Sequence, residues 1–528
     1  MNVRKLLDWR KLLLYCHRWM GIAGGLLFVS WFVSGIVIMY KGMPSLTAEE
    51  RLAHMAPVDL SAARLSPFEA ASEFGLDPTQ VRIEMFYDGR PIYRFQRGAA
   101  GYADTGELLP GADKEQALEF VRRWAPEHAS TITYDGYLED SDQWTLQAAQ
   151  RQYMPLHRIA LNDPADTHYY MSEITGEPVM KTDRETRWWG FWSAVLHWVY
   201  FKPLRLETYW WNQFIIWGSV FGAVMCLTGI VAGIWRFSVS ARFRQKGAQS
   251  HTPYSSWMRW HHYAGLLFGL FSFTWIVSGA LSVNPYGWSP GTGPTRQQRE
   301  AAAGGPMNME STTLDQLRRA AAAFAPEFEP KEIDVFQFRG DLYLSANRPD
   351  RVTGARDQRM VALSAPERGT FTKFDDGIMV DIAREAMPGA AVQDSTWLHE
   401  YDNYYYSRDG ARPLPVLRVR YNDPEQTWLY LDPHRGSITK YVRKSRLNRW
   451  LYHGLHSLDF PFLYNRRPLW DIVMIALSIG GIVLSSTTLL PSFRRLFRHV
   501  RHCANALRQF IRGRTADVRV EGQARYGK

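Results

Sequence analysis

Two apolar stretches of the sequence each carry one histidine followed by glycines at the spacing of an α-helix. The residues are His17, Gly21 and Gly25 in the first stretch and His261, Gly265 and Gly269 in the second, at a constant offset of 244 residues. Residues four apart share one face of a helix, and glycine lets a flat ligand come close. Histidine in an apolar span is costly without a partner. The pattern predicts two helices holding a haem iron between their histidines. The alternative is a plain helix–helix contact with histidines that face the headgroups.

A second pair of histidines lies in two aromatic segments that precede later apolar stretches. His197 occurs in WSAVLHWVYFKPL and His456 in LYHGLHSLDFPFL, 259 residues apart. Such segments would suit amphipathic anchor helices at a membrane surface, but the matching positions favour iron ligation. His453 has no counterpart, so we expect it beside the cofactor or the substrate.

The neighbouring histidines at 261 and 262 compete for the role of iron ligand. The offset that aligns His261 with His17 places His262 opposite Arg18, which cannot ligate iron. We therefore expect His261 to be the ligand, with His262 as the alternative.

Pairing the histidines like with like predicts two haems b. His17 with His261 would lie near one face of a bilayer about 30 Å thick, and His197 with His456 near the other. Two histidines fill both axial positions of an iron and leave none for oxygen. Two such irons would conduct single electrons across the membrane.

The composition predicts membrane spans alternating with large polar domains. The chain has 528 residues, 14% aromatic residues and a mean hydropathy of −0.30. Nevertheless it contains four apolar stretches of about the 20 residues that a span requires, at 19–40, 212–235, 260–283 and 470–490. There are three cysteines and no C-x-x-C-H motif, which excludes covalent c-type haem.

The charge distribution predicts the orientation of the spans. Residues 1–18, 236–260 and 491–528 together hold 20 basic and 3 acidic residues, although the whole chain is only +10. The positive-inside rule places these segments in the cytoplasm and the two long segments outside it. The net positive charge of the chain thus reflects its membrane topology. We expect contact with lipid and no binding of nucleic acid.

The two long outer segments resemble each other and predict α+β domains. IEMFYDGRPIYRF and DVFQFRGDLYLSA both indicate hairpins, and SPFEAASEFG, KEQALEFVRRWA and LDQLRRAAAAFA indicate helices. The predicted fold is four transmembrane helices in two tandem repeats with two periplasmic α+β domains. The expected boundaries are 1–40 (N-terminus and span 1), 41–186 (outer region 1), 187–235 (interfacial helix and span 2), 236–259 (cytoplasmic loop), 260–283 (span 3), 284–446 (outer region 2), 447–490 (interfacial helix and span 4) and 491–528 (basic cytoplasmic tail).

These motifs resemble those of PepSY-associated transmembrane proteins. The resemblance rests on H-R-W-x-G from His17 to Gly21, V-S-G from Val33 to Gly35 and W-L-Y-H-G-L-H from Trp450 to His456. Members of the family include inner-membrane siderophore reductases of the ferrioxamine type, with two haems and cystatin-like PepSY domains. The resemblance implies a bacterial inner-membrane oxidoreductase that reduces a ferric siderophore in the periplasm and releases Fe(II) for iron uptake.

The electron donor and the substrate contacts are less evident from the sequence. There is no G-x-G-x-x-G motif after a strand, so the donor would be quinol or a separate cytoplasmic reductase. Trp397, Tyr401, Tyr404 and Tyr137 could cradle a chelate, but the favoured alternative is aromatic cross-strand pairs on exposed strands of a domain that rests on the headgroups. A non-redox protein that binds peptide or assists envelope assembly is the alternative, and a transporter is a third, weaker hypothesis.

Overall fold

The computed structural model describes residues 9–76, 78–245, 247–325, 327–349, 356–407 and 412–525. The chain divides into two compact units. The membrane unit comprises Met1–Tyr40, Thr208–Pro285 and Leu451–Lys528, and the α+β unit comprises Lys41–Glu207 and Tyr286–Trp450. Each unit therefore draws on both halves of the chain. The start of the predicted N-terminal segment (1–8), Lys246 in the predicted loop and the last three residues of the predicted tail lie outside the described residues.

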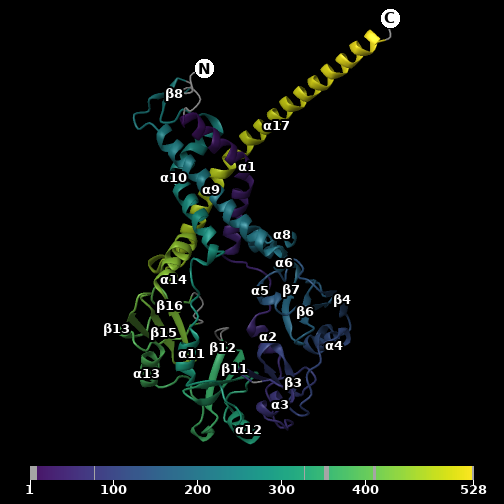
Figure 1. The fold of residues 1–528 in the computed structure, drawn as a ribbon, viewed down its shortest axis with the longest axis vertical. Helices are drawn as coiled ribbons and strands as arrows, with labels where there is room; N and C mark the ends of the chain where they lie inside the picture. Colours follow the sequence, from purple (N-terminus) through teal and green to yellow (C-terminus); the bar gives the residue numbers. More distant parts are fainter. Residues whose placement is uncertain are drawn as a thin grey trace. The chain divides into compact units, whose positions relative to one another are not determined.

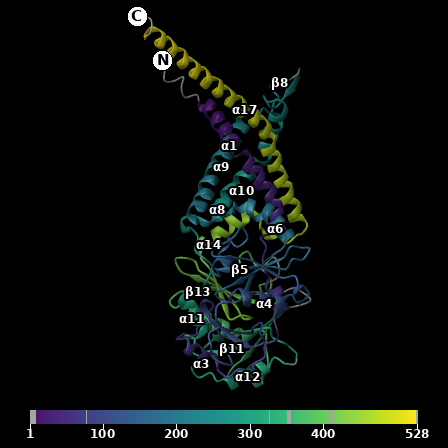
Figure 2. The ribbon, with the colours of Figure 1, turned by 90° about the vertical axis from the view of Figure 1, so that its right-hand side faces the viewer.

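Four long apolar helices form the membrane unit and run side by side (Figure 1, Figure 2). They are α1 (Trp9–Ile38), α9 (Thr208–Arg236), α10 (Ser256–Leu281) and α17 (Leu469–Arg525), and the apolar part of α17 is Leu469–Asn505. Each is longer than the about 20 residues that cross a bilayer core. Each predicted span falls on one of these helices. Helix α1 lies against α9 and α17, and α10 lies against the same two helices.

The outer surface of this bundle is apolar. Leu26, Ile234 and Leu267 are among many large apolar side chains that it exposes. Contiguous exposed apolar surface of this kind is rare on soluble proteins and is typical of membrane contact. The helices also satisfy their own backbone hydrogen bonds, as a lipid environment requires.

Helix α17 extends far beyond the predicted end of the fourth span (Figure 1). The sequence predicts only a basic tail from residue 491, but the helix runs through Pro491 to Arg525. Proline removes one backbone donor, a local cost that this long helix tolerates. A short hairpin of β8 (Phe243–Gln245) and β9 (Ala248–Ser250) lies between α9 and α10.

Three antiparallel sheets form the α+β unit. The first has the order β12–β11–β10–β1–β2–β3, the second β4–β5–β6–β7 and the third β13–β14–β15–β16. The strands are β1 (Val81–Met85), β2 (Pro91–Phe95), β3 (Ala100–Tyr102), β4 (Thr133–Leu138), β5 (Leu156–Ala160), β6 (His168–Ser172), β7 (Pro178–Thr182), β10 (Glu332–Phe338), β11 (Asp341–Pro349), β12 (Arg356–Ala362), β13 (Ala391–Leu398), β14 (Val416–Asn422), β15 (Trp428–Asp432) and β16 (Ser437–Tyr441).

Shorter helices cover these sheets or connect them to the spans. They are α2 (Ala48–His54), α3 (Pro67–Glu73), α4 (Lys114–Trp124), α5 (Ala148–Arg151), α6 (Arg184–Gly190), α7 (Leu196–Trp198), α8 (Lys202–Leu206), α11 (Arg296–Ala303), α12 (Leu314–Ala322), α13 (Asp376–Ala386), α14 (Arg443–Asn448), α15 (Leu455–Ser457) and α16 (Pro461–Tyr464). The predicted helices α3, α4 and α12 are present. Ser66 and Thr313 begin α3 and α12 with capping boxes, which satisfy the exposed amides of the first turn.

The six-stranded sheet joins the two outer segments. Both predicted hairpins are present, β1–β2 and β10–β11, and β1 also pairs antiparallel with β10. Val81 lies opposite Val335 and Ile83 opposite Ile333. The sequence predicts an independent domain from each segment, whereas the structure gives them one sheet and one core. A hairpin of short strands is marginal alone, so pairing two hairpins covers a free edge of each and buries their apolar faces together.

A buried cluster of charges crosses the same sheet. We call it the arginine–glutamate cluster, and it consists of Arg51, Arg82, Arg94, Glu84, Glu177 and Glu332. Glu84 is almost fully buried and pairs with Arg94, while Arg82 reaches Glu177 at 2.6 Å. Burial by itself would raise the pKa of the Glu84 carboxyl, but Arg94, Arg82 and Arg51 hold that pKa below its ordinary value near 4.5. Glu84 therefore remains ionised in the folded state.

Glu84→Gln should lower the free energy of unfolding of the α+β unit by about 3–5 kcal/mol, because it leaves buried arginine charge uncompensated. Since folding lowers the pKa of Glu84, its contribution is fully present above pH 4.5 and disappears as the pH falls below that value. Urea denaturation followed by tryptophan fluorescence measures both effects. The exposed Glu139→Gln is the control, and an equal, small loss for both variants would contradict the prediction.

Candidate functional site

A cavity of about 560 Å³ lies between the four helices of the membrane unit. Helix α1 lines it with one stripe at helical spacing, which includes Leu14, His17, Gly21, Gly25 and Phe28. Helices α9, α10 and α17 line the other sides, and α10 contributes the predicted residues His261, Gly265 and Gly269. The volume falls in the range of about 300–1,000 Å³ that cofactor and small-molecule sites occupy.

His17 and His261 face each other in this cavity. Their ring centroids are 6.1 Å apart, and the ring planes differ by 33°. His17 Nδ1 lies 2.9 Å from the carbonyl of Met225, and His261 Nδ1 lies 3.0 Å from the carbonyl of Leu484. A carbonyl only accepts hydrogen bonds, so each Nδ1 carries the proton and each Nε2 keeps its lone pair. This is the tautomer in which a histidine can bind a metal through Nε2.

Two threonines that the sequence analysis did not identify support these imidazole contacts. Thr228 donates to the Met225 carbonyl at 2.9 Å, and Thr487 donates to the Leu484 carbonyl at 2.8 Å. Each hydroxyl oxygen is also 3.4–3.5 Å from the Nδ1 of the histidine. The signal was present in the sequence, because the two threonines are 259 residues apart, like His197 and His456.

The predicted glycines differ in what they approach. A Cβ added to Gly21 would meet nothing within 4 Å, so this position opens into the cavity. At Gly25, Gly265 and Gly269 an added Cβ would lie 3.3–3.6 Å from side chains of neighbouring helices. The glycine stripes therefore serve both expected purposes, helix–helix approach and access to the cavity.

Gly229 on α9 is a further requirement of the site. A Cβ at this position would lie 2.5 Å from Cε1 of His17, closer than side chains tolerate. The absence of a side chain therefore lets the His17 ring approach α9 closely. Gly229 was missed because no glycine occurs at the matching position in α17, where Thr488 stands.

His262 points away from this pair and uses both ring nitrogens. Its Nε2 donates to the Gly233 carbonyl at 2.8 Å, and its Nδ1 accepts from the Thr252 hydroxyl at 2.6 Å. The side chain is only 5% exposed. With both nitrogens engaged, His262 fastens α10 to the end of α9 and to the α9–α10 loop, whereas His261 keeps one nitrogen for a ligand.

A sequence profile of the PepSY-associated TM region matches residues 14–364. The chain belongs to the PepSY-associated TM family. It is accordingly a multi-pass membrane protein, as the four apolar helices also indicate. No curated protein matches the chain. The matched range begins three residues before His17 and includes α1 from Leu14 onward and all of α9 and α10.

The second histidine pair of this PepSY-TM chain is divided between the two units. His197 lies on α7 of the α+β unit, and His456 lies on α15 of the membrane unit. His456 Nδ1 lies 3.1 Å from the Trp275 carbonyl and 3.2 Å from the Ser278 hydroxyl. Its Nδ1 therefore faces a carbonyl, as those of His17 and His261 do. The pairing of His197 with His456 stays a prediction.

Both of these histidines follow a π-helical turn and precede a left-handed residue. The turns are η4 (Phe191–Val195) and η7 (Arg449–Gly454), and η7 contains His453. Val199 and Leu458 adopt φ of 55° and 46°, which bulky side chains rarely do. π-turns and such backbone strain are frequent at functional sites, and here they occur at matching distances from His197 and His456.

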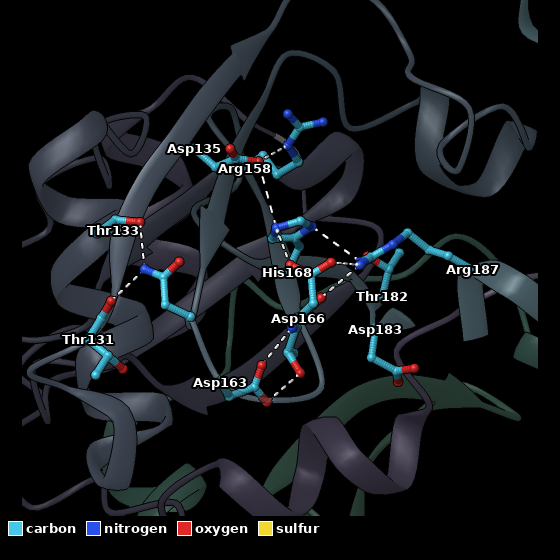
Figure 3. Close-up of polar contacts among 12 residues, drawn as sticks. Thr131, Thr133, Asp135, Arg158, Asp163, Asp166, His168, Thr182, Asp183 and Arg187 are labelled. Atoms are coloured by element: carbon cyan, nitrogen blue, oxygen red, sulfur yellow. Dashed lines mark hydrogen bonds and ion pairs between the residues drawn. The ribbon is translucent and has the colours of Figure 1, made fainter. Parts of the chain in front are cut away.

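Hydrogen bonds in and around the β5–β6 turn connect this sheet to α6, the helix that leads to His197 (Figure 3). Asp163, in the β5–β6 turn, accepts from the amide and the hydroxyl of Thr167 at 2.7 and 2.8 Å. Arg187 of α6 donates to the Asp166 carbonyl at 2.9 Å and the Thr182 hydroxyl at 3.0 Å. Since α6 continues into η4 and α7, this contact fixes the direction of the segment that carries His197.

The β14–β15 turn of the third sheet makes the same hydrogen bonds to its own residues and to the helix that follows. Asp423 accepts from the amide and hydroxyl of Thr427 at 2.6 and 2.8 Å, and Arg446 of α14 donates to the Gln426 carbonyl at 2.5 Å. The residues stand 259 or 260 positions after their counterparts. The sequence Asn-Asp-Pro occurs at both places, at 162–164 and 422–424, and in each it forms a turn that anchors a helix.

The predicted substrate residues lie within the fold of the α+β unit. Trp397 packs against the core under β13–β16, and Tyr401 and Tyr404 belong to a core cluster on the same sheet. Tyr137 lies apart from them on β4, where its hydroxyl donates to Glu173 and this bond raises the pKa of Tyr137 to about 12. The structure gives the first three a packing role and brings none of them together with Tyr137.

His262→Ala should lower the free energy of unfolding of the membrane unit by about 2–3 kcal/mol, because it removes two buried hydrogen bonds, to the Gly233 carbonyl and to the Thr252 hydroxyl. Thermal unfolding of the purified protein in detergent measures the loss. His502→Ala, at an exposed position on α17, is the matched control. A variant as stable as that control would show that His262 does not fasten these helices.

Proposed function

We propose that this protein is a haem b electron-transfer protein that reduces a ferric chelate outside the cytoplasm. The observation that carries the proposal is the facing pair His17 and His261, whose Nδ1 atoms are engaged by carbonyls and whose Nε2 atoms keep their lone pairs. Two imidazoles presented in this way inside an apolar cavity suit a metal in a flat macrocycle.

The residues present fit such a group. Metal–nitrogen bonds of about 2.0 Å to both rings would set the ring centroids about 6 Å apart, close to the observed 6.1 Å. Gly21 leaves one wall open, and Phe28 and Phe32 supply an apolar end. When bound, a bis-histidine haem supplies one-electron chemistry and offers no free iron position. The carbonyls of Met225 and Leu484 would hold both rings in the ligating tautomer.

The matched contacts of the two halves support a tandem repeat and a second haem. Thr228 and Thr487 make the same contacts, and so do Arg187 and Arg446. In this interpretation His197 and His456 hold the second haem near the outer end of the spans, and the two sites form a path across the bilayer. His453, which lacks a counterpart, would then lie on the substrate side.

The proposed setting is the bacterial inner membrane with both termini in the cytoplasm. The positive-inside rule supports this orientation, and it places the α+β unit in the periplasm. There one electron added to a ferric siderophore would convert Fe(III) to Fe(II), which siderophores hold less strongly. The electron would come from quinol or from a separate cytoplasmic reductase, since the sequence has no dinucleotide-binding fingerprint.

The purified protein should contain two haems b per chain with low-spin, bis-histidine absorption bands. His17→Ala and His261→Ala should each remove or convert to high spin one haem of the two, and His456→Ala should affect the other, because each variant loses one of two axial bonds. Absorption spectra and the pyridine haemochrome assay measure this. His502→Ala serves as the control. A protein without haem would favour the non-redox alternative. The ligand assignment would be refuted if His262→Ala removed a haem that His261→Ala retained.

A reporter enzyme that is active only outside the cytoplasm should be silent when fused after Gln249, in the α9–α10 loop, because that loop is predicted to be cytoplasmic. The same reporter inserted after Asp88, in the exposed turn between β1 and β2, should be active. Activity measured in whole cells, corrected for protein amount, decides between the orientations. The reverse result would place the α+β unit in the cytoplasm.

A further inference from the structure

Four arginines gather at one end of the cavity that holds His17 and His261. Arg18 comes from α1, and Arg494, Arg495 and Arg498 come from α17. All four have exposed side chains, and Tyr254 and Ser255 of the α9–α10 loop line the same cavity. Within the part of the chain that the structure describes, none of the four has a carboxylate partner. Like charges that line one cavity repel one another, and an anion bound between them would offset that repulsion.

The direction of α17 turns its arginines toward the cavity. In an α-helix each Cα–Cβ bond tilts toward the N-terminus. The N-terminal part of α17 contributes Leu484 and Thr488 to the cavity wall, and the arginines follow from residue 494 onward. Their side chains therefore lean back over the opening. Arginine stems readily extend along apolar surface in this way while the guanidinium stays at a polar boundary.

The charges are concentrated on the α1–α17 side of the opening. At the offset of 244 the counterpart of Arg18 is His262, which is occupied by Thr252 and Gly233. At the offset of 259 the counterpart of Arg494 is Trp235. The counterpart of Arg495 is Arg236, which does not line the cavity, so the arginines of the cavity lining lie on α1 and α17 alone.

We infer that these four residues, the arginine mouth, bind the two propionate carboxylates of the haem and fix its orientation. The inference rests on the proposed function. The apolar ring would lie between His17 and His261, with its acidic edge toward α1 and α17. Guanidinium groups pair with carboxylates through two parallel hydrogen bonds, and pairing here would also relieve the repulsion among the four charges. An anionic lipid headgroup offers the same chemistry, so the test must separate the two sources.

Haem-free full-length protein in nanodiscs of zwitterionic lipid should bind hemin more tightly than hemin dimethyl ester, which lacks both carboxylates. Arg494→Gln, Arg498→Gln and Arg18→Gln should each weaken hemin binding by on the order of tenfold, the loss of one charge-assisted bond. Binding of the ester and the low-spin spectrum should not change. Arg501→Gln is the matched control, because Arg501 is exposed on the same helix and does not line the cavity.

Two outcomes would overturn the inference while leaving the proposed function intact. One is wild-type binding of hemin and its dimethyl ester with equal affinity and low-spin spectra. The other is that the arginine variants lose only anionic lipid, measured in nanodiscs that contain phosphatidylglycerol, and bind hemin like the wild type. A wild-type protein that binds neither compound in a low-spin form would overturn the inference together with the proposed function.

Discussion

The hydrogen bonds from two imidazoles to two helix carbonyls constrain most of the membrane unit. His17 Nδ1 on the Met225 carbonyl and His261 Nδ1 on the Leu484 carbonyl require that α1 lie close to α9 and that α10 lie close to α17. The close approach requires glycine at 229, where a side chain would strike the His17 ring. Because buried histidine is costly in lipid, the carbonyl contacts also explain how both rings remain in an apolar interior.

This constraint separates two adjacent residues that a sequence pattern can hardly distinguish. His261 and His262 differ by about 100° around α10, so the ring of His261 faces His17 and the ring of His262 reaches the Gly233 carbonyl of α9. The Gly233 carbonyl and the Thr252 hydroxyl consume both nitrogens of His262. His262 therefore has no nitrogen left for a ligand, whereas His261 keeps its Nε2 available.

The sequence was informative wherever a local rule decides the structure. Length and hydropathy located the four spans, turn glycines located the hairpins, and helical spacing collected His17, Gly21 and Gly25 on one face. The sequence was not informative where the structure depends on a contact with a distant segment. The pairing of β1 with β10 depends on two edges separated by most of the chain, and no residue pattern within either hairpin announces it. Gly229 was equally invisible, because its importance comes from a ring on another helix.

The β1–β10 pairing has a consequence for how the chain could be divided. Aligned on the glycines of their turns, the two hairpins are offset by 251 residues. Arg82 pairs with Asp334, the counterpart of Ile83, and Ile83 pairs with Ile333, the counterpart of Arg82. Such reciprocity is the signature of a two-fold axis between like surfaces. Two separate polypeptides, cut in the α9–α10 loop, would still present each other with a matching strand edge and two helices apiece. The covalent link between the halves is thus dispensable in principle, and a half-length ancestor that worked as a homodimer becomes physically reasonable.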